Sequence, residues 1–229
     1  MEMDNSAAIP SVDDARSVSC DEALDGASEN SASSPSEKRA TPRFTLLIRA
    51  AKLVTSQGEF VCVLRDVSEA GVSIRLFHKL PHGDPIELHM PNGKVYELKT
   101  IWQEDNEAGF EFVGNVDVNR LINEAGEYPK RGLRLGLFFP IKITTIAGTS
   151  EGIVENLSQQ GARFESDSRF SIDQNLRVES MDGSPQLKDV TAKVRWRRDN
   201  QYGVVFDDTL TLGEFARLAA RLQCPVLLD

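Results

Sequence analysis

The sequence predicts a mainly β protein in which two copies of one β-rich domain follow a disordered N-terminal tail. Three observations support this fold class. Residues 1–38 have the composition of a disordered segment, the remaining chain consists of short strand-like runs separated by turn residues, and the order of those runs occurs twice. Many short strands at this spacing are typical of a barrel or a sandwich. A chain of 229 residues is long enough for two such domains.

The N-terminal segment, residues 1–38, is acidic and rich in serine. It holds nine acidic and two basic side chains, nine serines and no aromatic residue. Such a segment cannot bury enough apolar surface to offset its ordering entropy, so we expect a disordered tail, with folding on contact with a partner as the alternative. The other residues hold 26 acidic and 24 basic side chains. This near-neutral balance argues against DNA or RNA binding, which is typical of basic domains.

No feature of the sequence predicts membrane insertion or export. No apolar run approaches the ~18 residues of a transmembrane helix, and the acidic N-terminus lacks the apolar segment of a secretory signal. The three cysteines, Cys20, Cys62 and Cys224, are far apart in the chain. An odd number at this spacing predicts neither a disulfide framework nor a zinc site. We therefore expect a cytoplasmic protein.

The first domain is predicted over residues 39–127 and contains six strand candidates followed by a helix. The alternation in Val72–Phe77 places Val72, Ile74 and Leu76 on one face, and Asn92-Gly93 is a hairpin signal. Asp117 stands where it can cap the helix. The predicted elements are Leu46–Val54, Phe60–Leu64, Val72–Phe77, Ile86–Met90, Val95–Trp102, Phe110–Val113 and the helix Val118–Ala125.

The second domain is predicted over residues 128–229, and it repeats the first. Five landmarks recur in the same order 90 to 94 residues later. The paired landmarks are Arg43 and Arg134, Ser68 and Ser158, Gly71 and Gly161, Trp102 and Trp196, and Gly109 and Gly203. The predicted elements are Leu137–Ile146, Gly152–Glu155, Ala162–Glu165, Leu176–Glu179, Val190–Trp196, Val204–Phe206 and the helix Thr211–Leu222, which begins with a capping-box spacing. Two tandem copies joined near Gly126–Pro129 explain this pattern.

Two short motifs in the first domain carry the candidate chemistry. Arg39 and Arg43 are spaced RxxxR just before the first strand, and residues 66–71 (DVSEAG) form a DxSxxG turn between the second and third strands. With both motifs in this order inside a repeated β unit, the sequence resembles the PilZ family of bacterial cyclic di-GMP receptors. The resemblance covers residues 39–125 and, more loosely, 130–222.

The resemblance implies both a fold and a ligand. The fold would be two tandem six-stranded antiparallel β-barrels of the PilZ type, each with a C-terminal helix. The ligand would be cyclic di-GMP, held by Arg39, Arg43, Asp66, Ser68 and Gly71. A receptor of this kind passes the level of the second messenger to a protein partner, which the sequence does not name, by a change of shape or surface. We expect no other cofactor and no enzymatic activity, because Walker, HExxH and Cys–His signatures are missing from the sequence.

The chemistry of these residue types agrees with a guanine nucleotide as ligand. A guanidinium can grip the O6 and N7 acceptors of guanine with two hydrogen bonds, and the same planar fork suits a phosphate. A carboxylate such as Asp66 can accept from the N1–H and N2–H of guanine. Ser68 can bond a phosphate or a base, and Gly71 permits a tight turn or a close approach. An ordinary turn with the same residues is the alternative, and it leads to a protein-interaction scaffold with decayed ligand sites.

The second domain departs from the motif. Its arm has Lys130 at the first arginine position, Arg131 displaced by one residue, and Arg134. Lysine is a point charge and lacks the planar fork. The turn at residues 156–161 (NLSQQG) keeps Asn156, Ser158 and Gly161. We expect a weaker second site there, a site that binds by a different geometry, or a domain that serves only in packing.

Other conspicuous residues receive structural interpretations. His78, His82 and His89 are close in sequence, but Pro81 and Gly83 interrupt any helix that would align them, so no metal site is expected. Cys62 is predicted as a small core side chain. Trp102 and Trp196 are predicted to lie in the barrel cores. Arg195, Arg197 and Arg198 are interpreted as a solvated strand face, with a ligand phosphate or an acidic partner as the alternative.

Overall fold

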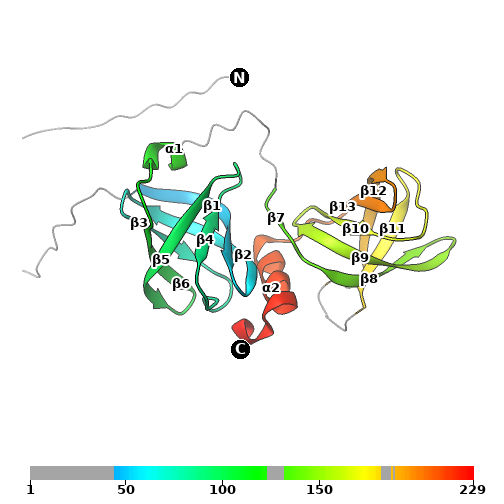
Figure 1. Ribbon diagram of the computed structural model, residues 1–229. Helices are drawn as coiled ribbons and strands as arrows, with labels where there is room; N and C mark the ends of the chain where they lie inside the picture. The colour runs from blue at the N-terminus through cyan, green and yellow to red at the C-terminus, as the bar shows by residue number, and fades with distance from the viewer. Residues whose placement is uncertain (1–43, 123–131, 182–186, 188) are drawn as a thin grey trace, which may run out of the picture. The chain divides into compact units, whose positions relative to one another are not determined.

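The computed structural model describes residues 44–122, 132–181, 187 and 189–229 (Figure 1). The predicted tail, both arginines of the first arm, the predicted join near Gly126–Pro129, and Lys130 and Arg131 lie outside these residues. Among the described helices, none is long and apolar enough to cross a membrane.

The first six strands close into an antiparallel barrel in the order β1-β2-β3-β6-β5-β4. Closure comes from β1, where Lys52–Val54 pairs with Glu87–His89 of β4. The β4–β5 hairpin turns at Gly93, whose φ of 85° is readily adopted by glycine, as Asn92-Gly93 predicted. The strands are β1 (Phe44–Thr55), β2 (Gly58–Val67), β3 (Gly71–Arg75), β4 (Ile86–His89), β5 (Val95–Glu104) and β6 (Glu107–Phe112), followed by helix α1 (Val118–Ile122).

The second barrel repeats this order with one change in its first strand. Where β1 is continuous, the second barrel has the short β7 (Arg134–Leu135), which pairs with the end of β9, and then β8, which pairs with the rest of β9. Strand β7 was not predicted from the sequence. The other elements are β8 (Phe139–Thr145), β9 (Gly148–Ser158), β10 (Gly161–Glu165), β11 (Asn175–Ser180), β12 (Val190–Arg198) and β13 (Gln201–Phe206). Pairing of β10 with β9 closes the ring, so the predicted pair of six-stranded barrels is confirmed.

Alternating apolar residues fill both barrels. Val72 and Ile74 of β3 and Leu76 just after it are all buried, as the period of two in the sequence predicted. Cys62 is fully buried, and its Sγ donates to the Ala51 carbonyl at 3.5 Å. Burial raises the pKa of this thiol to about 12. The interpretation of Cys62 as a core side chain is therefore confirmed.

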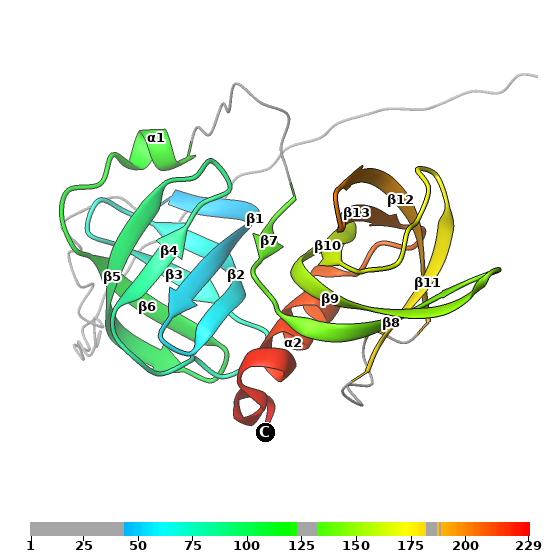
Figure 2. The same ribbon diagram turned by 45° about the vertical axis from the view of Figure 1, so that its right-hand side comes forward.

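Helix α2 (Leu212–Gln223) begins at the predicted capping box. Thr211 Oγ1 accepts from the Glu214 N–H, and the Glu214 carboxylate accepts from the Thr211 N–H at 2.8 Å. The helix buries Phe215, Ala216 and Ala219 in the core cluster of the second barrel. At its last residue, the Gln223 amide accepts from the Glu59 N–H and donates to the Glu59 carbonyl, both at 2.7 Å. Helix α2 therefore also bonds to β2, beside which it lies in both views (Figures 1 and 2). A short 3₁₀ helix, η1 (Pro225–Leu228), ends the chain.

His78 lies in the loop after β3 and is buried, with 3% of its surface exposed. Its Nδ1 is 2.7 Å from the Lys79 carbonyl, which can only accept, so Nδ1 carries the hydrogen. Nε2 then has no hydrogen, and it has no hydrogen-bond partner among the described residues. The ring packs on Phe60, with the two centroids 5.1 Å apart. Burial lowers the pKa of His78 below its usual 6.5, because a charged imidazolium would be desolvated here.

We predict that His78 makes the fold less stable in acid. The unfolded chain takes up a proton at this residue near pH 6.5, whereas the folded chain does so only at lower pH. The free energy of unfolding should therefore fall as the pH drops below 6.5, until the folded-state pKa is passed. His78→Asn, which keeps a donor for the Lys79 carbonyl, should show a smaller fall between pH 7.5 and 5.5 in urea titrations. Equal falls in both proteins would contradict this role.

Candidate functional site

The DxSxxG turn joins β2 to β3 and is held by its own residues. The Ser68 N–H donates to the Gly71 carbonyl at 2.8 Å, and the Gly71 N–H donates to the Ser68 carbonyl at 3.3 Å. The Ser68 hydroxyl also lies within hydrogen-bond distance of both backbone groups of Gly71. Asp and Ser commonly stabilise turns in this way. These hydrogen bonds therefore fix the backbone of the turn, which lies on the outer face of the barrel.

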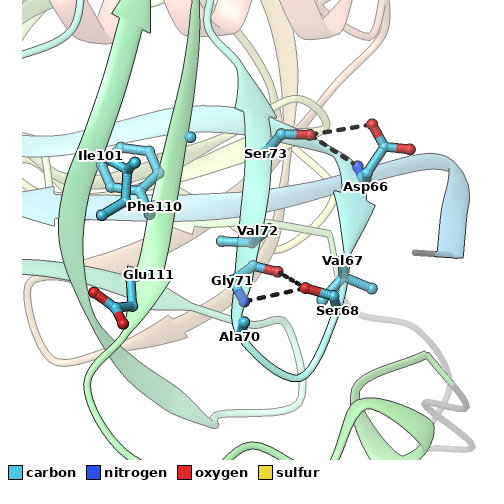
Figure 3. A pocket seen from close by; sticks show the side chains of 11 residues that line it. Asp66, Val67, Ser68, Ala70, Gly71, Val72, Ser73, Ile101, Phe110 and Glu111 are labelled. Atoms are coloured by element: carbon cyan, nitrogen blue, oxygen red, sulfur yellow. Dashed lines mark hydrogen bonds between the residues drawn. The ribbon is translucent and has the colours of Figure 1, made fainter. Parts of the chain in front are cut away.

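A β-bulge directs Asp66 to that outer face. The pairing between β2 and β3 shifts at Arg65, so Leu64 lies opposite Ile74 while Asp66 lies opposite Ser73. An extra residue in one strand reverses the alternation beyond it. Asp66 thus faces outward although Cys62 and Leu64 face the core. The Asp66 carboxylate accepts from the Ser73 hydroxyl, and the Asp66 N–H donates to the same hydroxyl, both at 3.2 Å (Figure 3).

Glycine is required at position 71 by a close approach between strands. A Cβ placed there would lie 2.1 Å from the Phe110 carbonyl oxygen of β6. No side chain fits at this distance, and the atom in the way belongs to the backbone of the barrel. Gly71 also lines the open space beside β3.

That space is a cavity of about 330 Å³ on the outer face of the first barrel (Figure 3). Its walls come from the turn, from β3 and from the facing parts of β5 and β6. The lining residues are Asp66, Val67, Ser68, Ala70, Gly71, Val72, Ser73, Ile101, Gly109, Phe110 and Glu111. The structure therefore brings together three of the five predicted ligand-binding residues. The other two, Arg39 and Arg43, lie outside the described residues.

Trp102 lies beside this cavity, and its prediction as a core residue was wrong. Its surface is 42% exposed, and its ring covers Gly109, where a Cβ would lie 1.9 Å from the indole Nε1. The reason is a second bulge, at Ile101, between the pairs Thr100–Phe110 and Trp102–Gly109. The bulge reverses the alternation, so Trp102 faces out. Trp196 is 43% exposed over Gly203 for the same reason.

Four more residues of this face were missed by the sequence interpretation. Ser73 bonds Asp66, Ile101 is 59% exposed on the bulge, and Glu111 lies opposite Gly71 on β6. Trp102 adds an exposed indole. The only sequence signal for them is the recurrence of Trp and Gly 94 residues apart in both copies, which singled out Trp102 and Gly109 but gave no direction for their side chains.

In the second barrel, the structure brings Arg134, the one arm residue it describes among the three predicted, next to the turn. Arg134 of β7 pairs with Ser158 of β9, and Ser158 pairs with Gly161 of β10. The Ser158 hydroxyl donates to the Gly161 carbonyl at 3.0 Å, as in the first turn. Asn156 lies on the same strand as Ser158, two residues before it. A smaller cavity of about 130 Å³ adjoins this turn and is lined by Gly132, Ser158, Gln159, Gln160 and Thr209.

The three histidines that the structure describes do not form a cluster of metal ligands. His78 is buried in a loop, His82 is exposed in the next loop, and His89 lies on β4, where its Nε2 is 2.7 Å from the Glu87 carboxylate. Among residues 44–122, 132–181 and 187–229 where described, no three His, Cys, Asp or Glu side chains gather closely enough to hold a metal. The groups that the candidate site of the first barrel offers to a ligand are therefore carboxylates, hydroxyls, an exposed indole and the backbone of the turn.

Comparisons with known proteins identify the domain type. The family model of the PilZ domain matches the sequence twice, at residues 37–124 and 130–223. No curated protein matches the sequence. Similar solved structures include the PilZ domain of CeSA from a cellulose-synthesizing bacterium, which is 17% identical, with 41% of this chain and 97% of that one covered and a TM-score of 0.31.

Two longer structures, each solved in complex with c-di-GMP, are also similar. Borreliella burgdorferi PlzA is 14% identical, with 77% of this chain and 88% of that one covered and a TM-score of 0.32. Escherichia coli YcgR is 11% identical, with 78% and 82% covered and a TM-score of 0.33. The two matches to the family model span most of the sequence, and the chain therefore belongs to the PilZ domain family, with two copies of the domain in tandem.

Proposed function

We propose that this protein is a cyclic di-GMP receptor whose ligand binds on the outer face of the first barrel. The observation that carries the proposal is the cavity lined by Asp66, Ser68 and Gly71 in a domain of the PilZ family. Its volume of about 330 Å³ falls within the common range of about 300–1,000 Å³ for small-molecule sites. A dinucleotide would also need the open surface around it.

Connectivity supports a role for the arginines of the first arm. Arg43 directly precedes Phe44, and Phe44 pairs with Val67 inside the DxSxxG turn. The arm therefore leads into β1, which pairs with β2 next to the turn that lines the cavity. We propose that Arg39 and Arg43 hold a guanine edge and a phosphate through their planar forks.

Each residue of the turn has a proposed task. Asp66 accepts from the N1–H and N2–H of guanine, and its bond from Ser73 orients the carboxylate. Ser68 bonds a phosphate or a base heteroatom. Gly71, which lines the cavity, lets the ligand approach the backbone of β3 closely. Trp102, exposed beside Gly109, offers an aromatic face on which a base can stack.

The signal would pass to a protein partner through a change of shape or surface. Such a switch requires that the ligand bind one conformation more tightly than another. The proposed task is reception, with no chemical step. The free thiols of Cys62 and Cys224 fit a reducing bacterial cytoplasm as the place of action.

Tryptophan fluorescence tests where the ligand binds. The chain has two tryptophans, so Trp196→Phe leaves Trp102 alone and Trp102→Phe leaves Trp196 alone. We expect saturating cyclic di-GMP to change the emission of the Trp196→Phe protein, because a base would stack on or shield Trp102. In the Trp102→Phe protein, the high-affinity phase of binding should cause no change in tryptophan emission. A high-affinity change seen only through Trp196 would move the receptor site to the second barrel.

A further inference from the structure

An apolar patch lies exposed on the outer side of β8 and β9, away from the turn of the second barrel. Ile153 of β9 is 55% exposed, Phe138 just before β8 is 76% exposed, and Met181 just after β11 is 46% exposed. Pro140 of β8, also exposed, joins them, because it lies opposite Ile153 and its carbonyl accepts from the Met181 N–H at 3.0 Å. Phe138 precedes Pro140 by two residues. These four residues form one contiguous surface, the β8–β9 patch, and such surfaces commonly mark interaction sites.

The equivalent face of the first barrel is covered by a helix. The offset of 90 residues between the two barrels equates Val63 of β2 with Ile153 of β9. The same offset equates Val61 with Glu151. Val63 is only 8% exposed, and Val61 is fully buried in a core cluster to which α2 contributes. Figure 2 shows β8 and β9 at the front of the second barrel, where the exposure of Ile153 leaves the corresponding face open.

Two carboxylates without a cationic partner flank Ile153. Glu151 precedes it by two residues on β9 and faces the same way, and Glu165 of β10 lies opposite Ile153. Both side chains are exposed, and neither forms an ion pair with any side chain in the described part of the chain. Glu165 accepts only from the side-chain amide of Asn200. The edge of the patch therefore carries a negative charge on each side of its central isoleucine.

The other charges around the patch cancel in pairs. Lys142 lies opposite Glu151 in the register of β8 and β9, but its Nζ is bound to the Glu179 carboxylate. Arg163 Nε lies 2.7 Å from the Glu155 carboxylate. Each pair is neutral, so the charges of Glu151 and Glu165 remain uncompensated.

These charges decide what can cover the patch. An apolar cover of the kind that α2 provides in the first barrel would bury the Glu151 carboxylate without a partner, which is costly. The cover must therefore bring a cation. The N-terminal segment, with nine acidic and two basic side chains, has the wrong sign. A second copy would bring the same two carboxylates, and like charges facing each other at an interface are unfavourable.

We propose that the β8–β9 patch is a docking surface for a basic amphipathic helix of another protein. The apolar side of that helix packs on Phe138, Ile153 and Met181, as α2 packs on β2. Its lysine or arginine side chains pair with Glu151 and Glu165. The apolar contact supplies affinity, and the charge pairs fix the orientation and select the partner. The proposal goes beyond the reception of cyclic di-GMP and does not depend on it, because none of these residues lines the cavity of the first barrel.

The test uses two labelled, stapled helical peptides and the full chain. Both peptides keep the apolar side of α2; one has lysine at the exposed positions and the other has glutamate. In fluorescence anisotropy without cyclic di-GMP, we expect saturable binding of the lysine peptide that weakens as salt increases. The glutamate peptide should bind at least about tenfold more weakly, because its charges repel the carboxylates of the patch.

A matched pair of variants locates the binding. Ile153→Ser should weaken binding of the lysine peptide at least about tenfold, since the central apolar contact is lost. The control is Ile172→Ser, which removes an isoleucine of nearly equal exposure, 54%, from a loop beside β12. Strand β12 is separated from β8 by β11, so binding should be unchanged in this variant.

Charge reversal tests the choice of partner. In the double variant Glu151→Lys and Glu165→Lys, we expect the preference to invert, with the glutamate peptide binding more tightly than the lysine peptide. Both positions are exposed, so the fold should be kept, and thermal unfolding of each variant checks this. Such an inversion follows from direct charge pairing and not from a structural role of the two carboxylates.

Several results would overturn the proposal. One is that the lysine peptide does not bind the unaltered chain at millimolar peptide. Another is an equal loss of binding in Ile153→Ser and Ile172→Ser, and a third is an unchanged preference for lysine after charge reversal. If sedimentation showed that the unaltered chain is a dimer and that Ile153→Ser dissociates it, a second copy would be the occupant. A cyclic di-GMP titration of Ile153→Ser, with unchanged affinity expected, reports on the first barrel, so failure of either proposal is seen separately.

Discussion

Replacing Arg43 with alanine is expected to lower the affinity for cyclic di-GMP by about tenfold to a hundredfold or more. The change removes a planar fork that would serve a guanine edge, a phosphate, or both. A bidentate contact to a base is worth about 1–3 kcal/mol, and each ~1.4 kcal/mol corresponds to a factor of ten in affinity. Isothermal titration of the full chain measures this loss directly.

Two further variants make the Arg43 result specific. Asp66→Ala should weaken binding and reduce the preference for guanine, because the acceptor for N1–H and N2–H is removed. Arg134→Ala, the equivalent arm residue of the second barrel, should leave most of the high-affinity binding intact. If Arg134→Ala abolished the high-affinity binding while Arg43→Ala preserved it, the second barrel would be the receptor.

Replacing Gly71 with alanine is expected to destabilise the first barrel by about 1–3 kcal/mol, the usual cost of overpacking. The added Cβ would lie 2.1 Å from the Phe110 carbonyl oxygen, and neither backbone can move without disturbing β3 and β6. The same shift would distort the cavity, so cyclic di-GMP binding should also weaken. Urea unfolding and titration calorimetry measure the two effects.

The matched control for Gly71 is Gly136→Ala. A Cβ at Gly136 would make only ordinary contacts, the nearest at 3.6 Å to the Glu59 carboxylate. Its N–H, which donates to that carboxylate at 2.6 Å, is kept in alanine. We expect a change within about 0.5 kcal/mol, as for most surface substitutions. Equal stabilities of the Gly71→Ala and Gly136→Ala proteins would contradict the close approach of β3 to β6 at this position.

The sequence predicted those parts of the fold that depend on local pattern. Alternation in Val72–Leu76 located β3, Asn92-Gly93 located the β4–β5 turn, and the Thr211–Glu214 spacing located the start of α2. Recurrence of Ser68, Gly71 and their counterparts revealed the tandem repeat. In each case the signal and its structural cause lie within a few residues, and so a single sequence is sufficient.

The parts that were missed depend on pairing between strands. Bulges at Arg65, Ile101 and Arg195 each reverse the alternation of a strand, and a period-two pattern read along one strand does not show them. They turn Asp66, Trp102 and Trp196 outward, and the first two of these residues lie at the candidate site of the first barrel. The short β7 was missed because its pairing with β9 depends on residues far along the chain.

Calorimetric titration of the unaltered full chain with cyclic di-GMP shows whether the first barrel is a receptor. We predict saturable binding whose high-affinity phase disappears in Arg43→Ala and survives in Arg134→Ala. If no binding occurred at millimolar ligand, the cavity beside the DxSxxG turn would be no receptor site, and the scaffold alternative would replace it.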